Sequence, residues 1–457
     1  MNRVQGARLF SLPVDLRQVV YALSASLDLV GIGDVAHGKR VGIMAAECSR
    51  FLGMSEAERR LLFELGVLHD IGVSSTITHH HLVSEFDWES SQRHCEVGYQ
   101  LLKDFRLLAP LALPIRYHHT HWYLLRDMVA VDRKVARQAN LIFLVDRCDA
   151  LAAPYYADGS LLMHTAEIRE RLAACSGEFF APELVDAFLK ASRSEAFWLQ
   201  LEARAINDYM LDMLQKREPC ITNNGELKVL ARIFSGIVDA KSPFTMTHSL
   251  GVSRLSRALA EQMGVSAMHC DMLEIAGLLH DLGKLRVPDE ILDKPASLTQ
   301  EERAVINTHS FETYQILRHI DGFEEIACWA AYHHEEPDGE GYPFHLPASA
   351  MALEARILRV ADIFQAMVQD RPYRRGLSAH DALTFMQQLA DQGRVDPVVV
   401  AVLEDHLPQM MMAAIPDHEQ DHSLIWRIGW PLTHVATSQL CLEQAAHGAG
   451  TGAQESA

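Results

Sequence analysis

Apolar residues recur along this chain at the spacing of amphipathic helices. Residues 353–368 carry apolar side chains nearly all round, as a buried helix does, and a further apolar run covers residues 272–279. One stripe at i, i+3, i+7 and i+11 is formed by Val252, Leu255, Leu259 and Met263. The alternation of apolar and polar residues that is typical of strands occurs only weakly, at residues 424–430. The pattern predicts an all-α fold.

Turn-forming and small residues divide the chain into segments. The polar stretch 222–225 precedes a fresh apolar period and predicts a domain boundary, and residues 195–216 predict one long connecting helix. The helical signal fades after Pro408, and the composition from Ala445 onward is typical of a disordered tail. We therefore expect an N-terminal domain over 14–190, a connecting helix and linker over 191–224, a C-terminal domain over 225–408, and an extension over 409–457.

Length and charge narrow the classes of function. A chain of 457 residues with 49% hydrophobic residues predicts two or three globular domains. The net charge of 41 − 60 = −19 argues against a nucleic-acid polymer as partner, and an anionic substrate would need metal ions or local Lys and Arg side chains. Eight scattered Cys, no apolar leader after Met1 and no run approaching 18 apolar residues predict a cytoplasmic protein without membrane insertion.

One group of polar residues stands out within the predicted helices of the C-terminal half. An adjacent His-Asp pair ends the apolar run 272–279, and further His and Asp residues lie upstream and downstream at helical sites. The seven candidate metal ligands are His248, His280, Asp281, His309, His333, His334 and Asp362. Five imidazoles and two carboxylates suit Fe or Mn better than a thiolate zinc site.

The same seven residue types recur in the N-terminal half, in the same order. These candidates are His37, His69, Asp70, His94, His118, His119 and Asp146. The offsets are 248 − 37 = 211, 280 − 69 = 211, 309 − 94 = 215, 333 − 118 = 215 and 362 − 146 = 216. Asp28 and Asp239 each lie nine residues before the first His of their set. The repeat predicts a tandem of two homologous helical domains.

The C-terminal half resembles the HD-GYP family. The motifs that carry the resemblance lie between residues 227 and 406: residues 333–343 with Gly341-Tyr342-Pro343, the dipeptide 294–295, and residues 362–366 leading to 371–374. The resemblance implies an all-α, metal-dependent phosphodiesterase fold for cyclic di-GMP with two or three Fe or Mn ions, and the seven C-terminal residues as their ligands. It also implies a diguanylate cyclase of the GGDEF type as a partner and leaves a homodimer open. Asp239 is the candidate ligand of a third ion. The family commonly has Glu at this position, and the shorter Asp side chain reaches such an ion less easily.

The chemistry of phosphodiester hydrolysis suits this set of residues. Two ions can hold a bridging hydroxide and neutralise phosphate charge, with Asp281 as the bridging ligand. His248, His280 and Asp362 would complete one ion, and His309, His333 and His334 the other. Lys284 is the candidate catalytic ammonium for the phosphate oxygens, and Gly341, Tyr342, Pro343 and Arg371 are candidate substrate-binding residues. Each also has a purely structural interpretation, as a surface lysine, a rigid corner or a loop-pinning arginine.

The N-terminal half keeps the candidate ligands but not the substrate motifs. Val73 stands where Lys284 would be, no Gly-x-Gly-Tyr-Pro follows His119, and residues 152–156 replace the arginine-rich loop. Because unpaired buried His and Asp are costly, we expect this half to bind metal without hydrolysing a cyclic dinucleotide. A vestigial domain kept for packing or sensing is the rival hypothesis.

The sequence thus predicts hydrolysis of cyclic di-GMP to linear pGpG, with GMP as a further product left open. Another cyclic dinucleotide, such as cyclic GMP-AMP, is the alternative substrate. A regulatory module that binds a nucleotide or a partner without turnover is the alternative class. The Gly341–Pro343 turn argues against a third option, a nucleotidase acting on mononucleotides.

Overall fold

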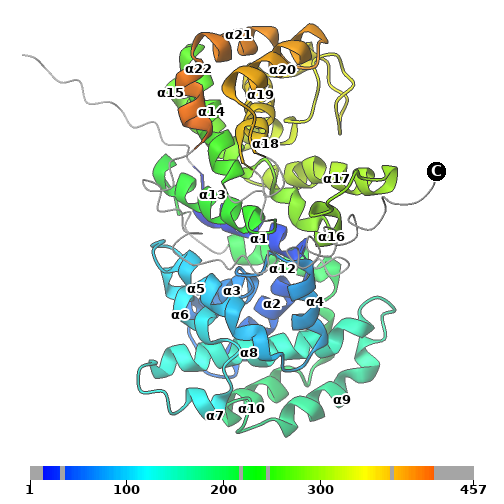
Figure 1. Ribbon diagram of the computed structural model, residues 1–457. Coiled ribbons are helices and arrows are strands. Elements are labelled where there is room, and N and C mark those ends of the chain that lie inside the picture. The colour runs from blue at the N-terminus through cyan, green and yellow to red at the C-terminus, as the bar shows by residue number, and fades with distance from the viewer. Residues whose placement is uncertain (1–13, 31–35, 216–219, 243–246, 371–374, 416–457) are drawn as a thin grey trace, which may run out of the picture.

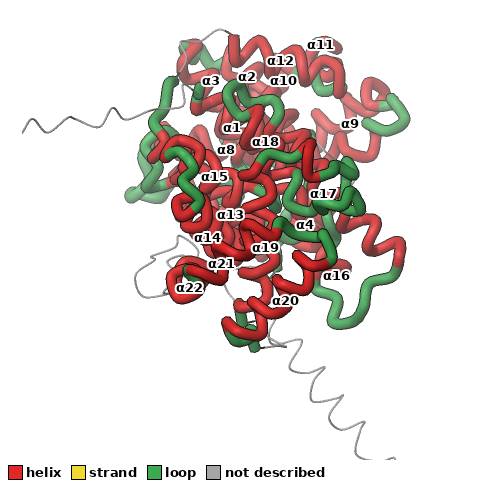
Figure 2. Tube along the Cα trace, turned by 90° about the horizontal axis from the view of Figure 1, so that it is seen from above, coloured by secondary structure: helices red, strands yellow, loops and turns green. Residues whose placement is uncertain are grey.

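The structure is a computed structural model that describes residues 14–30, 36–215, 220–242, 247–370 and 375–415. Within these ranges there are helices and three isolated bridges but no strand (Figure 2). The predicted all-α class is therefore confirmed. The weak strand signal at 424–430, the tail from residue 445 and Arg371 lie outside the described residues.

The N-terminal half contains helices α1 to α12. Their bounds are α1 Leu16–Asp28, α2 His37–Arg50, α3 Glu56–Leu68, α4 Thr76–Ser84, α5 Gln92–Leu102, α6 Ala109–Tyr117, α7 Trp122–Leu125, α8 Arg133–Ala152, α9 Leu161–Ala174, α10 Pro182–Ala191, α11 Glu195–Leu199 and α12 Ala203–Gln215. Two short 3₁₀ helices, η1 (Glu89–Ser91) and η2 (Ala153–Tyr155), complete it. Ser55 and Glu58 form a capping box that begins α3, since each side chain satisfies a free backbone N–H of the first turn.

The C-terminal half contains helices α13 to α22. Their bounds are α13 Asn224–Asp239, α14 His248–Gln262, α15 Ala267–Leu279, η3 Leu282–Arg286, α16 Asp289–Leu292, α17 Gln300–Leu317, α18 Glu324–Ala331, η4 Ala348–Ala350, α19 Leu353–Val368, α20 Ala379–Asp391, α21 Pro397–Asp405 and α22 Leu407–Ala414. The buried helix predicted over 353–368 is confirmed as α19, and Val252, Leu255 and Leu259 of the predicted stripe are fully buried in α14. Asn223, within the predicted boundary, is the N-cap of α13.

The single helix predicted over 195–216 is wrong, because the chain turns between α11 and α12. Phe197 and Trp198 pack edge to face, 5.3 Å between ring centroids, and the Trp198 indole N–H donates to the Ser192 carbonyl. Tyr209 then packs on the N-terminal half, where its hydroxyl donates to Glu47 at 2.8 Å. Helix α12 therefore lies against the domain it follows.

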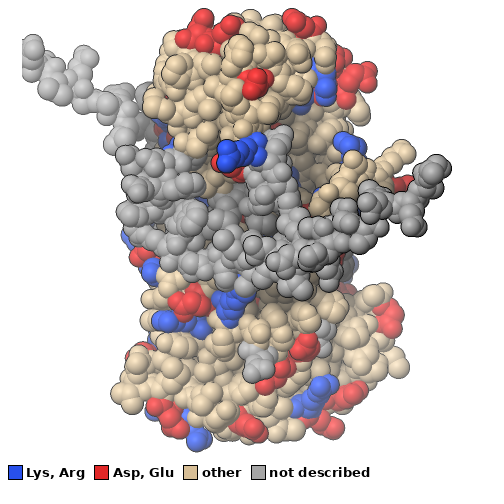
Figure 3. Space-filling model, in the orientation of Figure 1, with Lys and Arg blue, Asp and Glu red and all other residues tan. Residues whose placement is uncertain are grey.

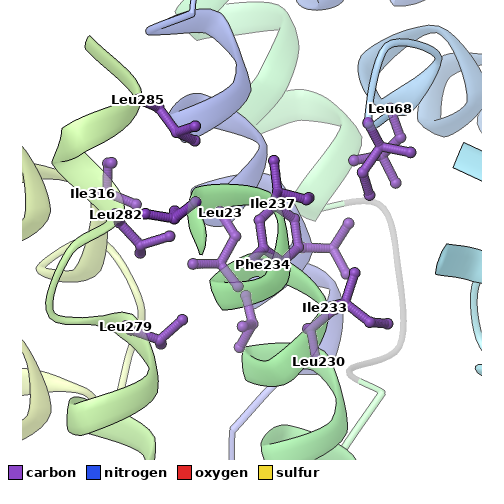
Figure 4. Close-up of a cluster of buried hydrophobic side chains, with 14 of the residues drawn as sticks. Leu23, Leu68, Leu230, Ile233, Phe234, Ile237, Leu279, Leu282, Leu285 and Ile316 are labelled. Carbon is purple, nitrogen blue, oxygen red and sulfur yellow. The ribbon is translucent and has the colours of Figure 1, made fainter. Parts of the chain in front are cut away.

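The two halves stack with α1 and α13 between them (Figure 1). Helix α1 contacts α2 and α3 of its own half and also α17 and η3 of the other. Figure 4 shows the resulting apolar cluster, in which Leu23 of α1 and Phe234 of α13 lie near Leu68 and Leu279. Leu68 and Leu279 directly precede the two His-Asp pairs, so both pairs lie beside the junction between the halves.

Candidate metal centres

Side chains that are far apart in sequence meet at one point in the C-terminal half. They are His248 at the start of α14, His280 and Asp281 between α15 and η3, His309 in α17, His333 and His334 after α18, and Asp362 in α19. All but His334 are buried. His248 Nε2 lies 3.1 Å from Asp362 Oδ1, and the ring centroids of His309 and His334 are 5.0 Å apart. The structure thus brings together all seven predicted ligands.

The Asp281 carboxylate lies between two groups of histidines. Its Oδ2 is 3.3 Å from His280 Nε2 and 3.7 Å from His248 Nε2. Its Oδ1 is 3.5 Å from His309 Nε2 and 3.8 Å from His333 Nε2. One oxygen faces each group, which is the arrangement that a carboxylate shared by two cations requires.

The tautomers of these imidazoles favour a cation between them. His280, His309 and His333 each place Nδ1 2.6–2.7 Å from the carbonyl three residues earlier, so the proton is on Nδ1 and the Nε2 lone pair points inward. The Nε2 atoms of His309 and His333 are only 3.1 Å apart, so two lone pairs face each other. Among the described residues, His280 Nε2 and Asp281 Oδ1 are buried without a hydrogen-bond partner. Both atoms carry lone pairs that no hydrogen bond uses, so they are suited to bind divalent metal ions.

Burial and neighbouring charges keep most of these side chains in the protonation states that bind metal. Burial opposes ionisation of Asp281, but His280 and Lys284 keep the pKa of this carboxyl well below its usual range. Burial lowers the pKa of His309 to about 4 and those of His333 and His334 well below the usual range. Neutral imidazoles and ionised carboxylates are the states that bind metal.

Lys284 and Asp239 both lie beside this centre. Lys284 Nζ is 2.6 Å from Asp281 Oδ2, and its side chain is 19% exposed, so the ammonium lies at the edge of the centre. Asp239 is buried and accepts a hydrogen bond from the Ser249 hydroxyl at 2.7 Å, and burial raises the pKa of Asp239 to about 7. Phosphate binding by Lys284 and a third ion at Asp239 stay predictions.

Sequence reasoning missed the residues that orient the first histidine of each set. His248 Nδ1 lies 2.6 Å from Gln365 Oε1, and His37 Nδ1 lies 2.8 Å from Asp149 Oδ2. The offset 365 − 149 = 216 equals that of Asp362 and Asp146. Both residues stand three positions after the helical Asp, on the same face, and this spacing is the signal that could have revealed them.

The N-terminal half repeats the geometry of the shared carboxylate. Asp70 Oδ2 is 3.4 Å from His69 Nε2 and 3.8 Å from His37 Nε2, while Oδ1 is 3.2 Å from His94 Nε2 and 3.8 Å from His118 Nε2. His119 Nε2 lies 3.8 Å from Asp146 Oδ2. A cavity of about 20 Å³ borders His37, His69 and Asp70, which is enough for one ion or water. All seven N-terminal candidates therefore also meet at one point.

Three differences distinguish this N-terminal centre. Val73 takes the position of Lys284, and the buried Arg147 guanidinium binds Asp146 Oδ2 at 2.9 Å. Cys95 replaces the equivalent Ser310 and lies 3.5 Å from His118 Nδ1. Burial raises the pKa of the Cys95 thiol, but the neighbouring imidazoles lower it to about 6, and Cys95 and Asp70 in turn raise the pKa of His94 to about 9 against the effect of burial.

The Gly341–Pro343 loop covers His334 in the C-terminal centre. The Tyr342 ring stacks on His334 with centroids 4.8 Å apart. A Cβ on Gly341 would lie 2.2 Å from Glu336 N, so only glycine allows this approach. Glu335, whose role was not predicted, is fully buried and accepts the N–H groups of Phe344 and Leu346 at 2.6 and 2.8 Å. The loop is therefore held rigidly beside the centre.

Comparison with known proteins agrees with this architecture. Two HD domain models match, over residues 35–153 and 212–399. The chain is 36% identical over 412 residues to 3′3′-cGAMP-specific phosphodiesterase 1 of Vibrio cholerae, covering 88% of this chain and 94% of the relative. It is 32% identical over 220 residues to a cyclic di-GMP phosphodiesterase response regulator of Xanthomonas campestris, covering 47% and 57%. The crystal structure of a cyclic GMP-AMP specific phosphodiesterase of V. cholerae superposes with a TM-score of 0.60 at 25% identity, covering 86% of this chain and 97% of that one.

The chain belongs to the HD-domain family as a tandem of two HD domains. The tandem architecture predicted from the repeat is thereby confirmed. None of the described helices is both long and apolar enough to cross a membrane.

Proposed function

We propose that this chain is a metal-dependent phosphodiesterase that hydrolyses a cyclic dinucleotide at the C-terminal centre. The observation that carries the proposal is the Asp281 carboxylate, with one oxygen facing His248 and His280 and the other facing His309 and His333. Such a shared ligand holds two cations close together, as two-metal hydrolysis of phosphate esters needs.

The side chains around the centre divide the work of the reaction. His248, His280 and Asp362 would hold one ion, His309, His333 and His334 would hold the other, and Asp281 would be a ligand of both. When bound, divalent ions supply Lewis acidity that neutralises phosphate charge and makes a nucleophile available at neutral pH. Lys284, at the edge of the centre, adds a positive charge that would stabilise the phosphate oxygens. Tyr342, stacked on His334, would form a wall of the substrate site.

The relatives favour 3′3′-cyclic GMP-AMP as the substrate of this chain. The 3′3′-cGAMP-specific phosphodiesterases 1 and 3 of V. cholerae align over 88% and 71% of this chain, and therefore over parts of both halves. Two relatives named for cyclic di-GMP, from X. campestris and Pseudomonas aeruginosa, align over 47% and 34%. Cyclic di-GMP, the substrate predicted from sequence, is the second candidate.

The identity of the metal, the location and the partners of the chain are also part of this proposal. Fe or Mn as the metal follows from the nitrogen and oxygen donor set. A cytoplasmic location, a diguanylate cyclase partner and a homodimer are the further elements that the sequence predicts.

The test is a substrate panel with purified full-length protein loaded with Mn or Fe. We expect chromatography to show a linear dinucleotide from 3′3′-cyclic GMP-AMP faster than from cyclic di-GMP, and a slower reaction with 2′3′-linked cyclic GMP-AMP. Conversion of cyclic di-GMP alone would replace the substrate assignment, and no conversion of any cyclic dinucleotide would overturn the proposed function.

Asp281→Ala tests the observation on which the proposal rests. Removing the shared carboxylate deletes a ligand of both ions, so we expect turnover to fall below detection and the C-terminal centre to lose its metal. Elemental analysis and product chromatography measure the two effects. Asp405→Ala, at an exposed acidic position of the same domain, is the matched control and should behave as wild type. Wild-type turnover and metal content in Asp281→Ala would contradict the assignment.

A further inference from the structure

A large cavity opens beside the N-terminal centre. It has a volume of about 690 Å³, and its walls include Trp88, Arg116, Tyr117, His119 and Tyr123. His119 is at once a member of the N-terminal histidine set and part of this wall, so the cavity borders that centre. A volume of this size accommodates a small organic molecule such as a nucleotide.

The cavity corresponds to the place that the 342–344 loop fills in the other half. There, Tyr342 stacks on His334, and Phe344 packs 5.6 and 5.3 Å from the rings of Tyr314 and Tyr332. The offset of 215 makes His119, Tyr99 and Tyr117 the counterparts of His334, Tyr314 and Tyr332. In the N-terminal half no such loop follows His119, and the Arg116 guanidinium takes the place of the Phe344 ring.

Arg116 is held in position by its neighbours. Its guanidinium carbon lies 4.8 Å from the centroid of the Tyr99 ring and 5.8 Å from that of Tyr117, and its Nε lies 2.8 Å from Glu96. The pair with Glu96 uses the Nε–H, and a guanidinium carries four further N–H donors. The side chain is 39% exposed, so these donors can reach a ligand.

The other walls offer stacking surfaces without repelling an anion. Trp88 is stacked on His81 with centroids 5.3 Å apart, which fixes the indole, and Tyr123 is 42% exposed. The two acidic side chains of the wall are both paired, Asp87 with His121 at 3.0 Å and Glu96 with Arg116. A phosphate joined to a planar base needs a cation for the phosphate and aromatic rings for the base. The cavity offers an arginine, two aromatic rings and the adjacent histidine centre.

We propose that this cavity binds a nucleotide, with its phosphate toward His119 and Arg116 and its base against Trp88 and Tyr123. The N-terminal domain is then a second nucleotide site of the molecule, separate from the C-terminal centre. Nucleotide binding at this site does not depend on turnover at the C-terminal centre. A failure of this proposal can therefore be distinguished from a failure of the proposed function.

The test is calorimetric titration of the metal-loaded full chain with GMP, which has no internal phosphodiester bond to be hydrolysed. We expect saturable binding that Arg116→Ala and Trp88→Ala each weaken at least tenfold. Tyr123→Ala, at a position where the side chain is 42% exposed, should also weaken it. Guanosine and inorganic phosphate should each bind much more weakly than GMP, because each contacts only part of the site.

Arg126→Ala is the matched control. It removes an exposed arginine near the cavity whose partner is Asp127 and which does not belong to the wall, so GMP binding should stay unchanged. Cyclic dinucleotide turnover, measured on the same preparations, should persist in every variant. Wild-type GMP affinity in Arg116→Ala, Trp88→Ala and Tyr123→Ala would overturn the proposal, as would the absence of any GMP binding to the wild type.

Discussion

At the residue scale, each centre depends on histidines that are fixed by the helix they terminate. His69, His118 and His280 are C-cap residues, and each places Nδ1 2.6–2.7 Å from the carbonyl three residues before it. The last carbonyls of a helix lack intrahelical partners, so one contact satisfies a free backbone acceptor and fixes the tautomer. The Nε2 lone pairs then point inward without further support.

Lys284 is the residue whose contribution can be separated from metal binding. We expect Lys284→Ala to reduce kcat/KM by about 10²–10³-fold, as loss of one charge-stabilising donor does. Metal content should be kept, because a lysine ammonium has no free lone pair and therefore cannot be a metal ligand. Lys284→Arg should recover part of the rate, since it restores a positive charge. Kinetics equal to wild type in Lys284→Ala would make this lysine a surface residue, and loss of metal would make it a support of Asp281.

The sequence could predict these residues only where a local pattern marks them. The repeat offsets identified fourteen candidate ligands, and the structure places each seven together. Lys284 was visible because it follows the His-Asp pair, but its 2.6 Å contact with Asp281 was not. Glu335 and Arg147 were not predicted, because Glu335 accepts a backbone N–H of the following loop and Arg147 donates to carbonyl oxygens of residues 82 and 85 as well as to Asp146, and only the folded chain brings these backbone groups near.

At the element scale, the glycine that follows each His-Asp pair sets the approach of a helix. A Cβ on Gly283 would lie 2.1 Å from the His309 carbonyl oxygen, and a Cβ on Gly72 would lie 2.1 Å from the His94 carbonyl oxygen. Helix α17 and η3 therefore meet backbone to backbone, and so do α5 and the loop after α3. This approach brings His309 and His94 to the shared carboxylates.

We expect Gly283→Ala to destabilise the protein by at least about 1–3 kcal/mol, as overpacking of a rigid contact does. It should also deplete metal from the C-terminal centre, because α17 must shift and carries His309 with it. Urea unfolding and elemental analysis measure the two effects. Thr308→Ala, on the exposed side of α17 next to His309, is the control and should leave metal content unchanged. If Gly283→Ala kept full metal content, the contact would not position His309.

At the scale of the whole molecule, the two halves share one core and one buried ion pair. Lys241 Nζ lies 3.0 Å from Asp289 Oδ1 and 3.3 Å from the Ser74 carbonyl oxygen, and the Ser75 hydroxyl donates to Asp289 at 2.7 Å. Ser74 and Ser75 follow the N-terminal His-Asp pair, and Asp289 follows the C-terminal one. The loops of the two centres are thus joined directly.

Loss of this pair should weaken the junction. We expect Lys241→Met to cost about 3–5 kcal/mol, because it leaves the Asp289 carboxylate buried without its cation. The midpoint of urea unfolding measures this. Lys190→Met removes the exposed partner of Asp186 and should change stability by less than about 1 kcal/mol. Equal small effects in both variants would show that the halves are held by the apolar cluster alone.

The two centres should divide the work of the molecule. Both have the shared carboxylate and its surrounding imidazoles, so both should bind metal. Only the C-terminal centre has the lysine and the Gly341–Pro343 loop, and without such positioning groups several kcal/mol of the proximity contribution to catalysis is lost. On the face drawn in Figure 3, acidic and basic side chains of the described residues are interspersed without a broad basic surface that could grip the substrate instead.

The paired variants His69→Ala/Asp70→Ala and His280→Ala/Asp281→Ala test this division, because each removes the same two ligands from one centre. We expect each to lose about half the bound metal, measured per chain by elemental analysis. The N-terminal variant should keep cyclic dinucleotide turnover, since the lysine, the loop and the other centre are intact, while the C-terminal variant should have none. Turnover that survives only in the C-terminal variant would place the working site in the other half. Loss of turnover in both would show that the joined loops make hydrolysis depend on metal at the N-terminal centre.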